Sequence, residues 1–436
     1  MRTLHWNSLS NLERRQVLER PAQRDAARTM GDVRAIVESV RRGGDAAVRQ
    51  LTRRFDGVEL ESFEVSELEF VDAERALDPA QHAAIDTAIG TVRAFHAAQL
   101  PSPLRIETAP GVICERIHVP VHAVGLYVPA GSAPLPSTAI MLAVPAAIAG
   151  CPQRLLCTAP NREGKADPAV LSAARKAGIE RIFKVGGAQA IAAMAYGTES
   201  IPKCDKLFGP GNAWVAAAKS LVAADPAGAA ADLPAGVSEV MVIADQHARA
   251  RFVAADLLAQ AEHGPDAQAL LISTSATLAE QVEQAVRLQM RTLSRQRILE
   301  SSVGEIRLLI VDSLDTALGI ANDYAPEHLL LQVQEPRAWL AKVRCAGAVF
   351  LGGWSPETMG DYCSGPNHTL PTYGYARAHS GLSVEDFLKR ITVQELSQSG
   401  FERLADTARI LASLEGLDAH AAAIDVRIAV LAEARA

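Results

Sequence analysis

Residues 239–275, EVMVIADQHARARFVAADLLAQAEHGPDAQALLISTS, carry the pattern that predicts the fold. Two apolar runs, EVMVIAD and ALLISTS, enclose a stretch rich in alanine and leucine that ends at Gly264 and Pro265. Short apolar runs with branched residues are typical of strands buried on both faces, and glycine followed by proline is typical of a helix end. The stretch therefore predicts a strand, a helix and a second strand of a largely parallel sheet.

The same alternation continues on both sides of this stretch. Further runs of the strand type are RLLCTAP (154–160), RIFKVG (181–186), RLLIVDS (307–313), HLLLQVQ (328–334) and GAVFLGG (347–353). So many strands exceed one sheet, and a loop rich in alanine, glycine, proline and aspartate predicts a domain junction near residues 225–238. We predict an α/β fold with more than one domain.

Helical patterns precede and follow this α/β region. From about residue 30 to residue 99, apolar residues recur at three- and four-residue steps, which predicts helices. After Ser380 the strand pattern disappears, and the sequence again predicts helices. A helical tail of this size cannot bury its own apolar face, so we expect it to dock on another domain or on another subunit.

Composition narrows the class of partner. The 436 residues carry a formal net charge of −7 and no long basic run, which argues against a nucleic-acid or anionic-membrane partner and favours a small molecule. The six cysteines form no CxxC pair and no dense framework, so we expect reduced thiols and a cytoplasmic location. We expect no export signal or membrane span, because the apolar stretch AIMLAVPAAIAGC is short and contains Pro145.

Acid–base candidates gather in four segments. In YAPEHL, Glu327 and His328 stand side by side behind Pro326, which stiffens the turn and disfavours helical geometry at the residue before it. At the entry to a strand, neighbouring side chains point to opposite sides, so one member of the pair could simply face solvent. If both line one cleft, the imidazole can take an alcohol proton and the carboxylate can activate water.

The other three segments supply possible metal ligands. Their residues are Gln260 and His263 at a helix end, Asp361 and His368 in the loop GDYCSGPNHTLPT, and Glu415 and His420 in EGLDAHAAA. Imidazole and carboxylate suit zinc or a similar divalent ion, but no pair has zinc-finger spacing. By spacing alone, each histidine could equally be a satisfied structural side chain and each carboxylate a helix cap.

Two glycine turns are candidates for nucleotide phosphate. Gly186 and Gly187 follow a strand and begin a helix, and in FGPGN the helix is capped by Asn212. Neither has the GxGxxG spacing, so the residues also fit ordinary tight turns.

Taken together, the segments LYVPAGSAPLPST, GGAQAIAA, FGPGN, QAEHGPD, YAPEHL and GDYCSGPNHTLPT resemble the histidinol dehydrogenase family, in the family's order and over nearly the whole chain. The resemblance implies a zinc-dependent enzyme that oxidises L-histidinol through L-histidinal to L-histidine, the last steps of histidine biosynthesis, and reduces two NAD. In this picture His328 is the general base on the alcohol, and Glu327 activates the water that hydrates the aldehyde.

The resemblance also implies the remaining site residues. The zinc ligands would be Gln260, His263, Asp361 and His420, with one zinc ion per subunit. The substrate would contact these four residues and Ser238, His328, His368 and Glu415. NAD would contact Tyr127, Gln189 and Asn212.

The implied architecture is two incomplete Rossmann-like, doubly wound domains with small helical segments at both ends. The expected parts are an N-terminal extension (1–25), a main α/β domain carrying zinc and the acid–base residues (26–130 with 239–382), a NAD-binding domain (131–238) and a helical C-terminal segment (383–436). The family implies a homodimer in which the C-terminal segment completes the partner's site.

Two positions depart from the family pattern. Ala130 replaces a common glycine and Val237 replaces a usual proline, so we expect altered affinity at most. Two alternatives stay open: a paralogue that oxidises another primary alcohol, such as a sulfonate or polyol, and a non-catalytic ligand-binding relative. Glu415 favours histidinol, because a carboxylate can pair with a cationic substrate, and the expected mark of a non-catalytic relative, a missing acid, base or ligand, is not found.

Overall fold

Two parallel sheets form the first unit of the protein, and an antiparallel sheet belongs to the second. The computed structural model describes residues 1–20, 26–130 and 133–435, without the side chains of residues 26–28. The first unit comprises Met1–Gln99 and Val121–Phe387, and the second comprises Leu100–Pro120 and Leu388–Ala436.

A six-stranded sheet contains the two strands predicted within residues 239–275, and all its strand pairs are parallel. Its strands, in order across the sheet, are β1 (Arg2–His5), β11 (Arg307–Ile310), β10 (Gln268–Ser273), β9 (Glu239–Ala244), β12 (His328–Gln332) and β13 (Ala348–Leu351). β9, β10 and β12 are buried along their whole length, as their apolar runs predict.

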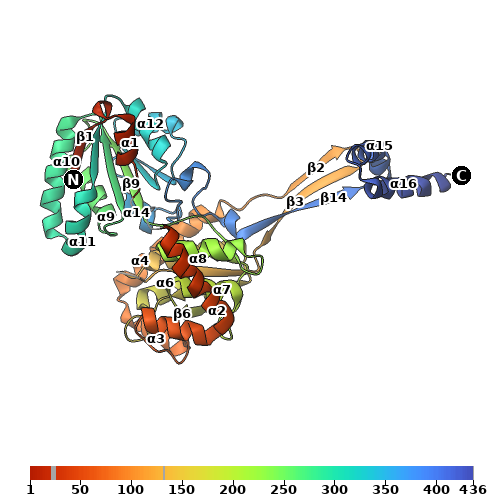
Figure 1. The fold of residues 1–436 in the computed structure, drawn as a ribbon, viewed down its shortest axis with the longest axis horizontal. Helices are drawn as coiled ribbons and strands as arrows, with labels where there is room; N and C mark the ends of the chain where they lie inside the picture. The colour runs from red at the N-terminus through yellow and green to blue at the C-terminus, as the bar shows by residue number, and fades with distance from the viewer. Residues whose placement is uncertain (21–25, 131–132, 436) are drawn as a thin grey trace. The chain divides into compact units, whose positions relative to one another are not determined.

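Helices cover both faces of this sheet (Figure 1). One face packs against α9 (Ala250–Ala261), α10 (Ala276–Gln289) and α11 (Gln296–Ser302), and the other against α12 (Leu314–Tyr324) and residues of α1 (Asn11–Val17). The short helices α13 (Pro336–Trp339) and α14 (Glu357–Tyr362) follow β12 and β13. The predicted α/β fold class is thus confirmed for this sheet.

A five-stranded sheet, also parallel in every pair, lies in the same unit. Its strands, in order, are β6 (Arg181–Lys184), β5 (Gln153–Thr158), β4 (Ala123–Val128), β7 (Lys206–Phe208) and β8 (Ala230–Ala231). Its helices are α5 (Pro136–Ala149), α6 (Pro168–Lys176), α7 (Gly187–Tyr196) and α8 (Ala213–Ala224).

The predicted N-terminal helices are α2 (Ala26–Phe55), α3 (Glu67–Ala76) and α4 (Pro79–Ala97). Apolar residues of α2 share a core with α7, α8 and the five-stranded sheet, and Figure 1 shows α2 beside them. The six-stranded sheet instead receives β1, because Arg2–His5 pairs with Arg307–Ile310. The predicted boundaries between domains stay a prediction, and the one near residue 25 lies outside the described residues.

Short 3-10 helices connect these elements. They are η1 (Trp6–Ser8), η3 (Met290–Thr292), η4 (Val303–Glu305), η5 (Leu340–Lys342), η6 (Tyr375–Arg377) and η7 (Val384–Phe387). Among the described residues, no helix combines the length and the apolar character needed to cross a membrane.

The second unit corrects the prediction of an entirely helical C-terminal segment. Its sheet has the order β14 (Leu388–Leu396), β3 (Val112–Pro120) and β2 (Leu104–Ala109), with antiparallel pairs. The helical prediction is wrong for β14, whose alternating charged and apolar residues pair with β3. It is confirmed for α15 (Gln398–Leu414) and α16 (Asp418–Glu433).

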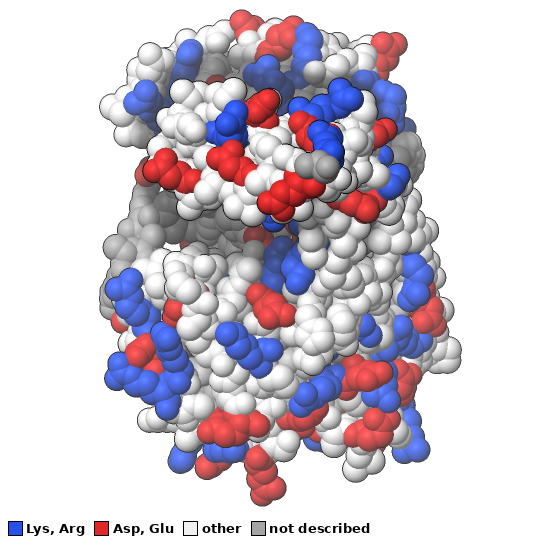
Figure 2. All heavy atoms as spheres, turned by 90° about the vertical axis from the view of Figure 1, so that its right-hand side faces the viewer, with Lys and Arg blue, Asp and Glu red and all other residues white. Residues whose placement is uncertain are grey.

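This unit buries little of its own apolar surface. In β14 nearly every residue is exposed, and large apolar side chains stay open to solvent on both helices. The exposed ones on its strands and helices include Leu104, Ile106, Ile117, Ile391, Val393, Ile410, Leu411, Leu414, Val426 and Val430. On the face of the molecule drawn in Figure 2, acidic and basic side chains are interspersed with uncharged ones.

Candidate active site

The turn between α12 and β12 delivers both acid–base candidates to the interior of the first unit. Ala325 ends α12 in the left-handed region, with φ 54°, and Pro326 follows it. Glu327 and His328 are 6% and 3% exposed, and Glu327 Oε2 lies 3.6 Å from His328 Nδ1. Because Glu327 still belongs to the turn, strand alternation does not separate the pair, and neither residue faces solvent.

Glu327 is held by two donors on one oxygen. The hydroxyl of Ser238 and the backbone N–H of Glu239 both donate to Glu327 Oε2, each at 2.8 Å. Burial raises the pKa of Glu327 well above its usual range, while these two hydrogen bonds act in the opposite direction by favouring the carboxylate. Glu327 is therefore a buried carboxyl group whose ionised form is stabilised by two hydrogen-bond donors already in place.

His328 is fixed in one tautomer. Its Nδ1 lies 3.1 Å from the backbone carbonyl oxygen of Glu239, and since a carbonyl only accepts, Nδ1 carries the proton. Nε2 is then the basic nitrogen, and it is buried without a hydrogen-bond partner. Burial lowers the pKa of His328 to about 3, so the ring is neutral at physiological pH and can accept a proton through Nε2.

Two carboxylates on α14 complete the surroundings of this imidazole. Glu357 Oε1 lies 3.4 Å from Nδ1, and Asp361 Oδ1 lies 3.7 Å from Nε2. Ligand atoms of His328, Glu357 and Asp361 all lie within 4.8 Å of one another. Burial raises the pKa of Asp361 to about 7 and that of Glu357 well above its usual range. A cation at this place would offset the cost of burying these charges.

Glu357 was not among the predicted residues. It lies four positions before Asp361 on the same short helix, so both project from one face. The acidic pair spaced by four in ETMGD is the signal that could have found it.

Gln260 lies in the last turn of α9 and is completely buried. Ser238 Oγ is 3.3 Å from Gln260 Oε1 and 2.8 Å from Glu327 Oε2, and its single proton serves the shorter contact. In this orientation of the amide, Gln260 Nε2 has no hydrogen-bond partner. Turning the amide over lets its nitrogen donate to Ser238 and directs its carbonyl oxygen to the unpartnered position, where it can ligate a metal.

The predicted histidines of the first unit lie around this group. His263 lies two residues beyond the end of α9, and its positive form lies close enough to lower the pKa of both His328 and His368. His368 Nδ1 donates to the Asp361 carbonyl oxygen at 2.9 Å, and its Nε2 lies 3.2 Å from Thr138 Oγ1. Burial lowers the pKa of His368 to about 4 and also lowers the pKa of His263. Both rings are therefore suited to act as neutral ligands or hydrogen-bonding groups.

Zinc fits this donor set. Amide oxygen, imidazole nitrogen and carboxylate oxygen are all ligands that zinc accepts, and Gln260, His263 and Asp361 offer one of each. The side-chain amide of Gln260 also has a buried Nε2 without a hydrogen-bond partner. Glu415 and His420 belong to the second unit, at the end of α15 and in α16, where both are exposed.

The predicted NAD residues lie at or after the carboxyl ends of strands in the five-stranded sheet. Tyr127 lies at the end of β4, Gln189 in the first turn of α7, and Asn212 caps α8 by accepting from the backbone N–H groups of Trp214 and Val215. The carboxyl edge of a parallel sheet is where nucleotides bind in open α/β folds.

Tyr127 shapes the turn before α7. Its hydroxyl accepts a hydrogen bond from the Gly187 N–H at 3.0 Å, and burial raises its pKa to about 12. Its backbone also requires glycine at position 209, because a Cβ there would lie 2.2 Å from the Tyr127 carbonyl oxygen. In the other turn Gly187 has φ 64°, and a Cβ on Gly186 would lie 2.4 Å from the Cβ of Ala159. The glycines of both turns are thus needed for backbone reasons, and that requirement is compatible with a bound phosphate.

The two departures differ in what they touch. The N–H of Val237 donates to the hydroxyl of Tyr373 at 3.1 Å, a bond that proline could not make. Ala130 is the last described residue before a gap, because Gly131 and Ser132 of the same motif lie outside the described residues.

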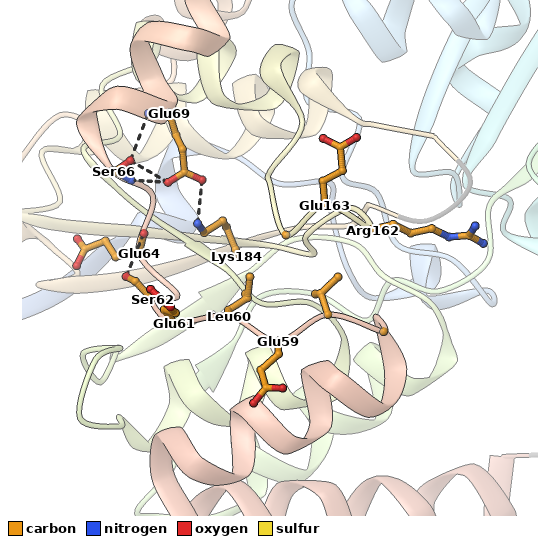
Figure 3. Close-up of a pocket in the computed structure, with 13 residues that line it drawn as sticks. Glu59, Leu60, Glu61, Ser62, Glu64, Ser66, Glu69, Arg162, Glu163 and Lys184 are labelled. Atoms are coloured by element: carbon orange, nitrogen blue, oxygen red, sulfur yellow. Dashed lines mark hydrogen bonds and ion pairs between the residues drawn. The ribbon is translucent and has the colours of Figure 1, made fainter.

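One cavity borders the site, and a second lies apart from it. The first, of about 780 Å³, is lined by Asn212, Val237 and Tyr373, among others, and so extends from a predicted NAD residue to the residue before Ser238. The other, of about 620 Å³, is lined by acidic side chains and none of the predicted site residues. Figure 3 shows Lys184 in it pointing at Glu69, with 2.8 Å between their charged atoms.

Comparisons with known proteins point to one family. The family model described as histidinol dehydrogenase matches residues 18–428. The histidinol dehydrogenase of Xanthomonas euvesicatoria pv. vesicatoria is 54% identical over 432 residues, which is 99% of this chain and 100% of that protein. The Vibrio vulnificus enzyme of the same name is 49% identical over 98% of each chain.

Among solved structures, histidinol dehydrogenase from Elizabethkingia anophelis is similar, with a TM-score of 0.93 and 41% identity. The match covers 99% of this chain and 98% of that one. Family model, relatives and structure confirm the resemblance and make the protein an oxidoreductase. The chain belongs to the histidinol dehydrogenase family.

Proposed function

We propose that the protein oxidises L-histidinol through L-histidinal to L-histidine in two NAD-linked steps, with zinc holding the substrate. The observation that carries this proposal is the arrangement around the backbone of Glu239. Its N–H donates to the carboxylate of Glu327, and its carbonyl oxygen accepts from His328 Nδ1, which leaves His328 Nε2 free. Two oxidations of one carbon need two different proton transfers, and these two side chains offer them.

NAD, when bound, supplies the hydride acceptor of each oxidation, and zinc supplies a fixed positive centre that orients the substrate. His328 takes the alcohol proton through Nε2 in the first oxidation. Glu327 takes a proton from the water that adds to the aldehyde, and Ser238 and the Glu239 N–H hold its carboxylate in place. The protein's main contribution is orientation.

The residues proposed for zinc are Gln260, His263 and Asp361 from one copy and His420 from the other. Ser238, His328 and His368 would contact the substrate from the first unit, and Glu415 from the partner's second unit. Exposed apolar side chains on both helices of the second unit support a homodimer, because an isolated monomer rarely leaves so many open.

We assign NAD to the five-stranded sheet, through Tyr127, Gln189 and Asn212. Support comes from their common position at the carboxyl ends of parallel strands and from the cavity that joins Asn212 to the neighbourhood of Ser238. The proposal places the enzyme in the cytoplasm, which the free cysteines of the described residues support.

The test compares zinc-loaded wild type with His328→Asn in the oxidation of L-histidinol. The variant is expected to lose roughly 10²–10⁴ in kcat, the usual contribution of a general base, and to keep its zinc. The exposed His122→Asn variant is the matched control and should retain full activity. Oxidation of another primary alcohol but not of histidinol by wild type would instead support the paralogue.

A further inference from the structure

A buried ion pair lies directly behind the acid–base residues. Glu239, the first residue of β9, is 1% exposed, and Arg20 is 7% exposed. Arg20 Nε lies 2.5 Å from Glu239 Oε1, and Arg20 Nη2 lies 2.8 Å from Glu239 Oε2. This is the bidentate geometry of a strong arginine–carboxylate pair. The two residues are 219 positions apart in the sequence.

The backbone of Glu239 is the common support of Glu327 and His328. Its N–H donates to Glu327 Oε2 at 2.8 Å, and its carbonyl oxygen accepts from His328 Nδ1 at 3.1 Å. A movement of this one residue would therefore displace both catalytic groups together. It would also release the bond that keeps the proton on Nδ1 and leaves Nε2 basic.

Arg20 holds the same turn from its other end. Its Nη2 donates to the Tyr324 carbonyl oxygen at 2.9 Å, and its guanidinium lies 3.8 Å above the Tyr324 ring. Tyr324 ends α12, three residues before Glu327. The arginine thus ties the start of β9 to the turn that presents the acid–base pair.

Stability alone does not account for this pair. A buried ion pair contributes little net stability compared with apolar residues of similar size, because burying two charges offsets their attraction. A third donor, the backbone N–H of Tyr373, also binds Glu239 Oε1 at 3.0 Å, so the carboxylate is fixed in direction and position.

We propose that Arg20 and Glu239 are positioning residues that hold the Glu239 backbone where it fixes Glu327 and selects the Nδ1–H tautomer of His328. This inference rests on the proposed function of that pair. The N-terminal segment, expected only to be an extension, then takes part in the arrangement of the active site through Arg20.

The test is the double variant Arg20→Met/Glu239→Gln. It removes both charges together, so no charge is left buried alone, and glutamine keeps an acceptor for the Tyr373 N–H. We expect a melting temperature near that of wild type, a kcat lowered by roughly 10- to 100-fold through misplacement of the reacting groups, and KM values for histidinol and NAD changed less than threefold. Wild-type kcat in the folded double variant would overturn the proposal.

A second readout does not depend on turnover. In metal-free protein, ¹⁵N chemical shifts of His328, assigned with His328→Asn, report which ring nitrogen carries the proton. Wild type should show Nδ1–H alone, and the double variant a mixture of tautomers. An unchanged Nδ1–H tautomer in the double variant would overturn the proposal even if kcat fell. Failure of wild type to oxidise histidinol would refute the proposed function and leave this measurement valid.

Two further variants complete the design. Arg20→Lys keeps the charge but loses the bidentate contact with Glu239, so the kcat of this variant should fall at least threefold. If the double variant does not fold, Arg20→Lys is the deciding variant, and an unchanged kcat would reject the proposal. The control is Arg181→Met/Glu64→Gln, which removes a more exposed bidentate pair, with contacts of 2.7 and 3.0 Å, whose arginine belongs to the edge strand β6 of the five-stranded sheet. It should leave kcat and the His328 tautomer unchanged.

Discussion

Replacing Asp256 with asparagine is expected to stabilise the protein more at pH 8 than at pH 5. Asp256 lies in α9, is 6% exposed, and accepts a hydrogen bond from Gln332 Nε2 at 2.5 Å. Burial raises its pKa from the ordinary 3.8 to about 7. The folded protein therefore binds this proton more tightly than the unfolded chain does.

The sign and the size of the change in unfolding free energy with pH follow from this difference in proton binding. A raised carboxyl pKa means that stability is highest below the unfolded-state pKa and falls as pH rises toward the folded-state pKa. A rise of about three pH units, at about 1.36 kcal/mol each, corresponds to about 4 kcal/mol lost above pH 7. Part of that loss is already present at pH 5, so the advantage of asparagine should grow by about 3 kcal/mol between pH 5 and pH 8.

The assay is urea unfolding of metal-free wild type and Asp256→Asn at both pH values, with a chelator present to remove any contribution of metal to stability. The exposed Asp72→Asn variant, which makes the same carboxylate-to-amide change at the surface, serves as control. A difference between Asp256→Asn and wild type that is the same at pH 5 and pH 8 would refute the reasoning.

Three further predictions concern the chemistry. Glu327→Gln should slow the oxidation of supplied histidinal by roughly 10²-fold or more and that of histidinol by less than tenfold, because only the second step needs activated water; equal losses would contradict the division of labour. His420→Asn should lose zinc, measured per subunit by metal analysis, while His122→Asn keeps it; full zinc occupancy with a normal KM would reject the ligand role. Mixing inactive His420→Asn with inactive His328→Asn should restore part of the activity, and no recovery after proven subunit exchange would argue against sites shared between subunits.

Most strands that the sequence predicted are buried along most of their length, whereas the edge strand β13 is half-buried. RLLIVDS and HLLLQVQ form β11 and β12 because a strand covered by helices on both sides is apolar throughout. β14, LKRITVQEL, was missed because it is exposed along most of its length and carries charged residues between apolar ones. Its pairing with β3 depends on residues more than 260 positions away, and no local pattern contains that information.

The site was predicted to a different extent at each residue. Glu327 and His328 were found because they stand together behind a proline in a segment that matches a family motif. Their common burial could not be read from strand alternation, since it depends on the left-handed Ala325 that precedes the strand. Arg20 and Glu239 carry no motif, and only the fold brings them together.

The central claim is a four-electron oxidation by one site, and the end point of NADH formation tests it most directly. Purified, zinc-loaded protein is mixed with limiting L-histidinol and excess NAD, and absorbance is followed until it stops rising. The account predicts two NADH per histidinol, abolished by a chelator and restored by zinc. One NADH per histidinol with histidinal as the final product, or no NADH from folded and metal-loaded protein, would contradict it.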